Sequence, residues 1–254
     1  MGRFSRVSAQ VFKNYKLMHN PWRTFDVTIW PLVLFFSIVL FASFIGVSGK
    51  MLSAVVLGLI GWRCVYHFHV DLVTSHMDEY WDNSLPFLMA SPIRRAEFVA
   101  GGVITAAAKF IIVFTLFSVL GSLLFGFYIS DPMVVLISLL ALAAFGIASG
   151  VLALGLIYAF GRVAFPAAYS LPDVLVIFTG VYYPISVFPE PLRSAAQLLP
   201  STYAFEALRS TLGMGTFNPA ALLVTVLAFA VVAVLFNTWA FEYARRRGSL
   251  ARLG

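Results

Sequence analysis

The sequence contains little charge and almost no cysteine. Charged residues make up 11% of the 254 residues, whereas hydrophobic residues make up 61%. Soluble domains carry roughly 25% charged residues, so the low charge excludes an ordinary soluble protein and predicts an all-α integral membrane protein. The single cysteine, Cys64, excludes a disulfide within the chain. At this length we expect residues 1–254 to form one membrane domain with no attached soluble domain.

Enzyme motifs are also scarce. There is no GxxxxGK[ST] phosphate-binding loop and no HExxH metal motif. A GxSG pattern makes Ser48 a candidate nucleophile, but a nucleophile needs a nearby base, and no histidine follows His76. His67 and Asp71 could share one helix face around a metal ion, although one helix then supplies only two of the four ligands of a structural site. We therefore predict no catalytic residue, no metal and no cofactor bound directly by this chain.

Long apolar runs dominate the rest of the chain. Six of them approach or exceed the 20 or so residues that a helix needs to cross a bilayer. They cover residues 27–47, 51–73, 99–129, 133–160, 164–183 and 219–241. Residues 1–22 precede them and carry apolar side chains at helical spacing, with basic and amide side chains on the other side. This pattern predicts an amphipathic helix that lies on the cytoplasmic surface of the membrane.

Lysine and arginine are unevenly distributed among the connections between these runs. With the N-terminus inside, the cytoplasmic set is Arg3, Arg6, Lys13, Lys16, Arg23, Arg94, Arg95, Arg162, Arg245, Arg246, Arg247 and Arg252. The outer set is only Lys50, Arg193 and Arg209. Cytoplasmic loops carry an excess of lysine and arginine, so we predict that both termini are cytoplasmic.

Three charged residues are expected near the middle of the bilayer: Arg63, Lys109 and Asp173. Counting about 1.5 Å per residue from the predicted span ends places each of them roughly 13–18 Å into a core about 30 Å thick. Charges at this depth usually pair or face a cavity. An ion pair between Arg63 and Asp173 is the first hypothesis, and contact with a transported substrate is the alternative.

Prolines interrupt the stretch after the fifth predicted span. Proline removes a backbone donor and disfavours helix at the residue before it, so this span should end near residue 183. The two short helices expected at 191–199 and 202–212 cannot cross a bilayer. We predict that 184–212 forms a re-entrant cap on the outer face, covered by the other spans. The residues expected at this outer gate are Tyr183, Pro184, Pro189, Pro200, Tyr203, Glu206 and Arg209.

The longest polar connection, residues 74–98, lies between the second and third predicted spans. Residues 78–93 read DEYWDNSLPFLMASPI and combine acidic with aromatic side chains. About 25 residues is more than a tight turn requires, and a solvated loop would not need Trp81 and Phe87. The pattern indicates a recognition surface for another protein.

This connection resembles a loop of type 2 ABC transporter permeases, in which an acidic residue and a leucine-rich turn precede Ser-Pro-Ile/Val. The outer stretch is similar to the segment before the last span in that family, with Tyr-Pro, Phe-Pro and Leu-Pro steps followed by Thr202-Tyr203 and Glu206-Ala207-Leu208-Arg209. The order of the spans agrees as well, so the resemblance covers essentially the whole chain.

The resemblance implies the transmembrane permease subunit of an ABC exporter in a prokaryotic cytoplasmic membrane. Two such subunits, identical or different, would form the translocation pathway, and each loop would form a coupling helix that docks on a separate ATP-binding subunit. That partner would hold ATP and Mg²⁺; membrane lipid is expected as a further partner, and nucleic acid is not. The docking residues implied are Tyr80, Trp81, Asp82, Leu85, Phe87, Ser91 and Pro92.

Two other classes of protein stay open at this point. An ion-coupled secondary carrier could be built around Arg63, Lys109 and Asp173. Such carriers often contain two repeated halves with paired broken helices, whereas only one broken region occurs in this sequence. An intramembrane hydrolase could use Ser48 or the polar group at residues 67–79.

Overall fold

The computed structural model describes residues 3–248, which form helices and turns without any strand. Residues 1–2 and 249–254 lie outside the described residues, and Arg252 of the predicted cytoplasmic set is among them. Five helical segments are long and apolar enough to cross a membrane. They are α2 (Pro21–Phe44), α3 (Gly49–Trp81), α5 (Arg95–Phe125), the segment Pro132–Phe178 that begins with α6 (Pro132–Phe160), and α10 (Pro219–Arg246). The chain is therefore an all-helical, multi-pass membrane protein.

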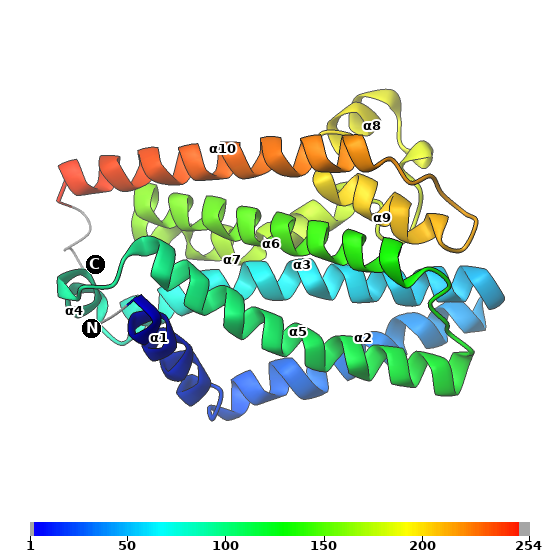
Figure 1. The fold of residues 1–254 in the computed structure, drawn as a ribbon, viewed down its shortest axis with the longest axis horizontal. Helices are drawn as coiled ribbons and strands as arrows, with labels where there is room; N and C mark the ends of the chain where they lie inside the picture. The colour runs from blue at the N-terminus through cyan, green and yellow to red at the C-terminus, as the bar shows by residue number, and fades with distance from the viewer. Residues whose placement is uncertain (1–2, 249–254) are drawn as a thin grey trace.

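Helix α3 lies at the centre of the bundle and contacts α2, α5 and α6, whereas α10 packs on α6 (Figure 1). Its 33 residues give it a length of about 50 Å. The helix ends where Asn83 takes a left-handed conformation with φ 53°, and the Ser84 amide then donates to the Glu79 carbonyl at 2.9 Å. The prediction that a loop begins at residue 74 is wrong, because the helix continues eight residues beyond Val73. The connection to α5 covers residues 82–94 only.

Glycines allow close contact between α3 and its neighbours. A Cβ atom at Gly146 of α6 would lie 2.7 Å from the carbonyl oxygen of Val65. A Cβ atom at Gly58 of α3 would lie 2.7 Å from the carbonyl oxygen of Val181. Only glycine permits these backbone distances, so the two glycines set how closely α6 and the segment after α7 approach the central helix.

The fifth predicted span is shorter and less regular than expected. After α6, the chain forms a 3₁₀ turn, η1 (Gly161–Ala164), then α7 (Phe165–Leu175) and a second 3₁₀ turn, η2 (Val176–Phe178). Helix α7 runs back beside α3, where His69 Nε2 lies 2.9 Å from the carbonyl oxygen of Ala168. Helical structure ends at Phe178, five residues before the predicted end. Pro172 removes a donor inside α7, and Gly180 has a left-handed φ of 65°, which ends the run.

Short helices follow, as the prolines predict. They are η3 (Ile185–Val187), α8 (Glu190–Ala196) and α9 (Pro200–Ser210). Helix α9 begins at Pro200, two residues earlier than predicted. Its Phe205 and Leu208 side chains are buried in the main core with residues of α3 and α6. Helix α9 is therefore an internal part of the bundle, whereas α8 lies on its outside (Figure 1).

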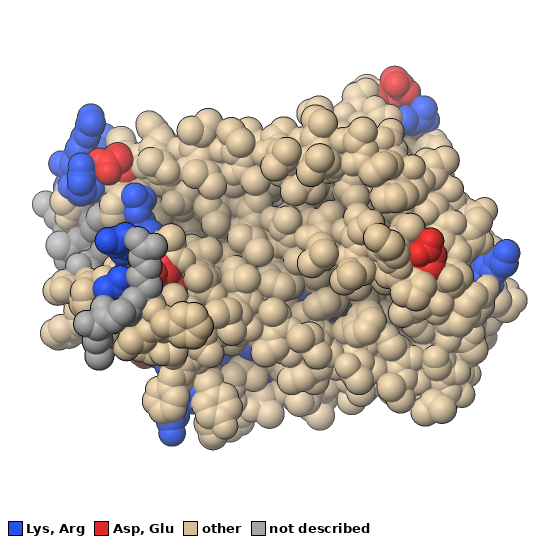
Figure 2. Space-filling model, viewed as in Figure 1, with Lys and Arg blue, Asp and Glu red and all other residues tan. Residues whose placement is uncertain are grey.

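The two ends of the bundle differ in charge. Helix α1 (Arg3–Leu17), helix α4 (Leu85–Ala90) and the C-terminal end of α10 lie at one end, and α8 and α9 lie at the other (Figure 1). On the face shown in Figure 2, most lysine and arginine side chains gather at the α4 end. On this face, the surface between the two ends is almost free of charged side chains, as expected for a part of the protein that faces lipid.

Candidate functional site

Helix α1 is attached to the bundle through its polar side chains. Ion pairs join α1 and the start of α2 to the α4 ends of α3 and α5: Arg6–Glu97, Lys13–Glu79 and Arg23–Asp78. The Arg6 guanidinium contacts both oxygens of Glu97, at 2.7 and 2.8 Å. The hydrogen bonds from Arg6 to this carboxylate raise the pKa of Arg6 above its ordinary value.

Amide side chains continue this attachment between the ion pairs. Gln10 donates to the Ser75 hydroxyl at 3.1 Å, and Ser75 donates to the Asn14 side-chain oxygen at 3.1 Å. Asn14 in turn donates to the Thr105 hydroxyl of α5 at 3.2 Å. Gln10 and Asn14 are buried, whereas an interfacial helix would ordinarily expose such residues to water. The polar face of α1 therefore contacts α3 and α5 through these side chains.

The apolar face of α1 points away from the bundle. Phe4, Phe12 and Tyr15 are exposed, and together with Val7 they line a shallow apolar groove that Ile104 of α5 closes on one side. An amphipathic helix at a membrane surface presents its apolar side to the acyl chains. This orientation is consistent with the predicted interfacial position of α1, at the edge of the uncharged band.

The connection between α3 and α5 presents aromatic side chains to the surface. Trp81 is 60% exposed, and Phe87 of α4 is 77% exposed. Asp82 and Pro92 are exposed beside them, and Ser91 is partly buried. Helix α4 has only six residues: Pro86 is tolerated in its first turn, and Pro92 disfavours helical structure at Ser91, where the helix ends. Leu85 is the first residue of α4, and its side chain is not described.

Tyr80 does not belong to this surface. Its side chain is 4% exposed, and its ring packs edge-on against Phe165 with 5.2 Å between ring centroids. Because α3 continues as a helix to Trp81, successive residues point in directions about 100° apart. Tyr80 consequently faces the core while Trp81 faces outward. The prediction that Tyr80 is a docking residue is wrong on this ground.

A second polar site is a groove of about 520 Å³ between α2, α3 and α7. Its walls are rich in aromatic side chains: Phe25, Trp30, Trp62, Tyr66, Tyr169 and Tyr182. Arg63, Asp26 and Asp173 also line it. Arg63 is 3% exposed, its guanidinium lies 4.5 Å from the centre of the Tyr66 ring, and one terminal nitrogen lies 3.1 Å from His67 Nε2. A buried cation in an aromatic groove open at the side of the bundle could contact a cargo or a second subunit.

The predicted pairing of the intramembrane charges is wrong. Among residues 3–248, no ion pair within 4 Å joins Arg63 to Asp173, and Asp173 is exposed at the groove. Lys109 instead pairs with Asp71, with Nζ 2.6 Å from Oδ1 and both side chains largely buried. Asp71 and His67, the pair that could share one helix face around a metal ion, have other partners. The structure makes Asp71 the counter-ion of Lys109.

We expect the free energy of unfolding of the double variant Arg63→Gln with Asp173→Asn to change by the sum of the changes in the two single variants. No ion pair within 4 Å joins these two described residues, and effects of sites that do not interact add to within about 0.3–0.5 kcal/mol. Asp173→Asn alone should not lower the stability, because this carboxylate has no ion-pair partner among the described residues and lines the open groove. Thermal unfolding of the detergent-solubilised variants measures all three values. A double variant more stable than the sum would restore the hypothesis of a direct pair.

The predicted outer-gate residues meet around the chain reversal at Gly180. Arg209 donates to the Gly180 carbonyl at 2.5 Å and lies 3.3 Å from Glu206. The Tyr183 hydroxyl donates to the carbonyl oxygen of Ile177 at 2.9 Å. Burial lowers the pKa of Arg209 from its ordinary value, and Glu206 opposes that shift. The other four predicted gate residues lie at helix starts or against the core. Pro184 directly precedes η3, Pro189 directly precedes α8, and Pro200 is the first residue of α9. The partly buried Tyr203 side chain packs against the hydrophobic core.

The residues proposed for an intramembrane hydrolase are not brought together. Ser48 is an exposed residue at the start of α3, and His67 lies 19 residues along the same helix, about 28 Å away. His67 faces Arg63, and Asp71 faces Lys109. Within the described part of the chain, no three His, Cys, Asp or Glu side chains are grouped so that they could hold a metal ion.

These features define a multi-pass helical membrane protein with an exposed aromatic connection at one end and a proline-interrupted cap at the other. Residues 78–212, or 135 of the 254 residues, match the sequence model of the ABC-2 type transporter family. The chain belongs to this family, and it is therefore the permease component of an ABC transporter. Membrane subunits of this kind lack a nucleotide site of their own and work with an ABC ATP-binding subunit. A comparison with curated proteins finds no match.

Proposed function

We propose that this protein is the permease subunit of an ABC exporter in a prokaryotic cytoplasmic membrane. The α4 end, with both termini, faces the cytoplasm, and α8 and α9 face outward. The excess of lysine and arginine at the α4 end supports this orientation. A separate ATP-binding subunit docks on residues 81–92 and supplies the energy for transport.

In this proposal the segment from η1 to η2 is the sixth crossing. Residues 161–178 are helical throughout and run back from the α4 end beside α3 and α6. A crossing by so few residues leaves 179–183 as irregular backbone near the outer face. Such backbone is tolerated only where protein covers it, and Arg209 of α9 supplies a donor to Gly180 at this point. Helices α8 and α9 then act as the re-entrant cap over the outer exit.

The proposal that the permease acts as a dimer rests on the groove between α2, α3 and α7. Asp173 is exposed on the side of the bundle, inside an apolar segment. A carboxylate facing lipid near the bilayer centre costs about 2.5–3.5 kcal/mol. A second permease subunit, identical or related, would cover this groove and convert two open grooves into one enclosed translocation pathway.

The observation that carries the docking assignment is the exposure of Trp81 and Phe87. Trp81 ends α3 and Phe87 belongs to α4, so both lie at the α4 end of the molecule (Figure 1). Large aromatic side chains are typical centres of protein–protein interfaces, and the exposed Asp82 beside them adds a charge that a partner can recognise.

We expect Phe87→Ala to reduce co-purification of the ATP-binding subunit by about tenfold or more, and Trp81→Ala with Phe87→Ala to abolish it, because interface anchors contribute about 2 kcal/mol each. The measurement is the amount of ATPase retained by tagged permease, together with ATP-dependent transport in vesicles. Trp22→Ala is the matched control, since Trp22 is an exposed aromatic residue outside the connection.

Phe87→Ala is the more informative single change, because Trp81 also contacts Phe165 and its loss could loosen the permease itself. Full ATPase association by the double variant would refute the docking assignment. Transport driven by an ion gradient without any ATPase would refute the exporter and favour a secondary carrier.

A further inference from the structure

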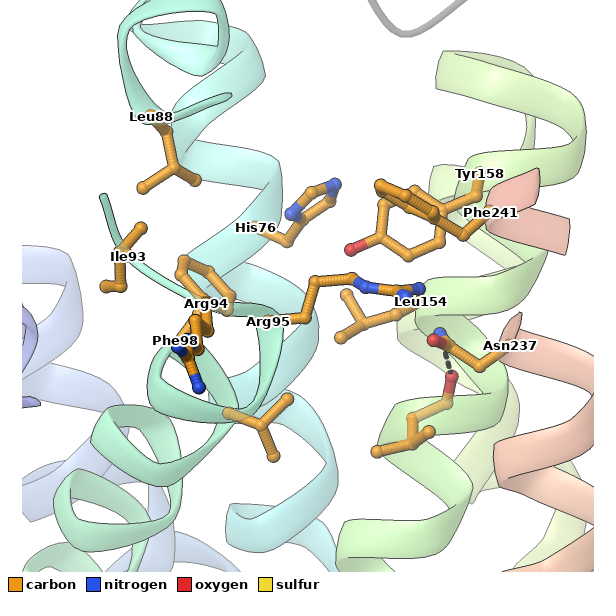
Figure 3. Close-up of a pocket in the computed structure, with 12 residues that line it drawn as sticks. His76, Leu88, Ile93, Arg94, Arg95, Phe98, Leu154, Tyr158, Asn237 and Phe241 are labelled. Carbon is orange, nitrogen blue, oxygen red and sulfur yellow. Dashed lines mark hydrogen bonds between the residues drawn. The ribbon is translucent and has the colours of Figure 1, made fainter. Parts of the chain in front are cut away.

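A small cavity lies behind the connection between α3 and α5, and Leu88, Ile93 and Arg94 of that connection line it. It has a volume of about 230 Å³ and is bounded by residues of α3, α4, α5, α6 and α10 (Figure 3). Its apolar walls come from Leu88, Ile93, Phe98, Leu154 and Phe241. The polar side chains that line it are His76, Arg94, Arg95, Tyr158 and Asn237. These polar groups converge from four separate helices and the α4–α5 connection, and the proposed docking mechanism uses none of them.

Arg95 gives the cavity a positive charge. Its side chain extends across the cavity toward α6 and α10 (Figure 3), and its guanidinium lies 4.0 Å from the centre of the Phe241 ring. None of the ion pairs among the described residues includes Arg95, and none of the twelve lining residues is acidic. Stacking on an aromatic ring holds the guanidinium in place while its N–H groups stay available.

The acidic residues on the surrounding helices are engaged elsewhere. Glu97 of α5 pairs with Arg6, and Glu79 and Asp78 of α3 pair with Lys13 and Arg23. Glu242 of α10 pairs with Arg245. These carboxylates therefore do not neutralise Arg95, and Arg94 adds a second cation to the lining of the cavity.

His76 supplies an independent sign that a ligand belongs in the cavity. The side chain is 1% exposed, and its Nε2 atom has no hydrogen-bond partner among the described residues. The ring lies edge-on to Tyr158, with 5.1 Å between centroids. Asn237 is fixed by a bond from its side-chain nitrogen to the Val151 carbonyl at 2.8 Å, drawn as the dashed line in Figure 3. Buried polar atoms in native proteins almost always have a partner, so the free histidine nitrogen indicates a group that the chain itself does not supply.

We propose that this cavity binds the phosphate group of an anion, either the headgroup of an anionic lipid or a soluble phosphate. Arginine fits phosphate oxygens through paired N–H donors, and the Tyr158 hydroxyl and His76 add donors from the facing wall. The volume exceeds by several times the roughly 30 Å³ that one water occupies in the liquid. Basic pockets between membrane helices near the bilayer surface are known to hold lipid headgroups. The site stands independently of the docking proposal, and its test uses binding rather than transport.

The test is a binding titration of the full chain in a neutral detergent, followed by native mass spectrometry or by radiolabel retention. The probes are phosphatidylglycerol, inorganic phosphate, and oleate as an anion without phosphate. We expect saturable binding of at least one phosphate probe, weakened about tenfold by Arg95→Gln. Arg246→Gln is the matched control, because it removes an exposed arginine from the same end of the molecule, and it should change the affinity by less than about twofold.

The outcomes separate the two sources of phosphate. Saturable binding of phosphatidylglycerol alone assigns a lipid headgroup, and binding of inorganic phosphate assigns a soluble anion. If Arg95→Gln does not fold, Tyr158→Phe removes one donor and keeps the ring, and about threefold weaker binding is expected. The proposal is overturned if neither phosphate probe saturates the wild-type protein, if oleate binds as tightly as phosphatidylglycerol, or if these variants bind like Arg246→Gln.

Discussion

Replacing Lys109 by methionine is expected to lower the stability of the folded protein by about 3–5 kcal/mol. Lys109 Nζ lies 2.6 Å from Asp71 Oδ1, and the other carboxylate oxygen of Asp71 has no partner among the described residues. Removing the lysine leaves a buried negative charge without compensation. Thermal or denaturant unfolding in detergent micelles measures the loss.

Two further variants make this result specific. Adding Asp71→Leu to Lys109→Met should recover most of the lost stability, because replacing both members of a buried ion pair with apolar residues is often neutral. Lys50→Met makes the same substitution at an exposed position and should change stability by less than about 0.5 kcal/mol. A Lys109→Met protein as stable as the wild type would show that Asp71 does not depend on this lysine.

Reversing the charge of Glu79 is expected to release α1 from the bundle. Glu79 is buried, pairs with Lys13 and accepts a hydrogen bond from Ser84, so Glu79→Lys places two positive charges together where an ion pair stood. We expect a loss of about 2–3 kcal/mol, smaller than at Lys109 because Lys13 is a third exposed to solvent. The measurements are the unfolding midpoint and the rate of proteolysis between α1 and α2.

The charge swap Glu79→Lys with Lys13→Glu restores opposite charges and should return most of the protection from proteolysis. Lys16→Glu is the control, since Lys16 is an exposed lysine on the same helix and forms no ion pair with α3. If the swap protects α1 no better than Glu79→Lys alone, the Lys13–Glu79 contact does not hold α1 in place.

The sequence was sufficient to locate most of the helices, because long apolar runs bounded by proline, glycine and capping residues have few alternatives in a membrane. Helix α10 begins at residue 219, as predicted, and helix α6 begins at residue 132, one residue before its predicted start. The end of α3 was harder to predict. Residues 74–81 look like a solvated loop because they are polar, yet α1 and the start of α2 supply their partners. Lys13 and Glu79 are 66 residues apart in sequence, and no local pattern encodes such a contact.

The same error explains the missed ion pair. Depths counted from a span ending at Val73 placed Asp71 near the membrane surface, far from the level of Lys109. In the structure Asp71 lies ten residues before the end of α3, and Lys109 lies fourteen residues after the start of α5. These offsets correspond to about 15 and 21 Å from neighbouring helix ends. Asp71 and Lys109 therefore lie at similar depths, but this could be predicted only from the correct ends of α3 and α5.

The proline-free course of α3 has a mechanical consequence. An unbroken helix keeps its hydrogen bonds and its rise per residue along its whole length, so it behaves as a stiff rod from the aromatic connection at Trp81 to the contact of Gly58 with Val181 below the cap. If α3 is displaced at one membrane surface, its opposite end is therefore displaced by a similar distance at the other surface.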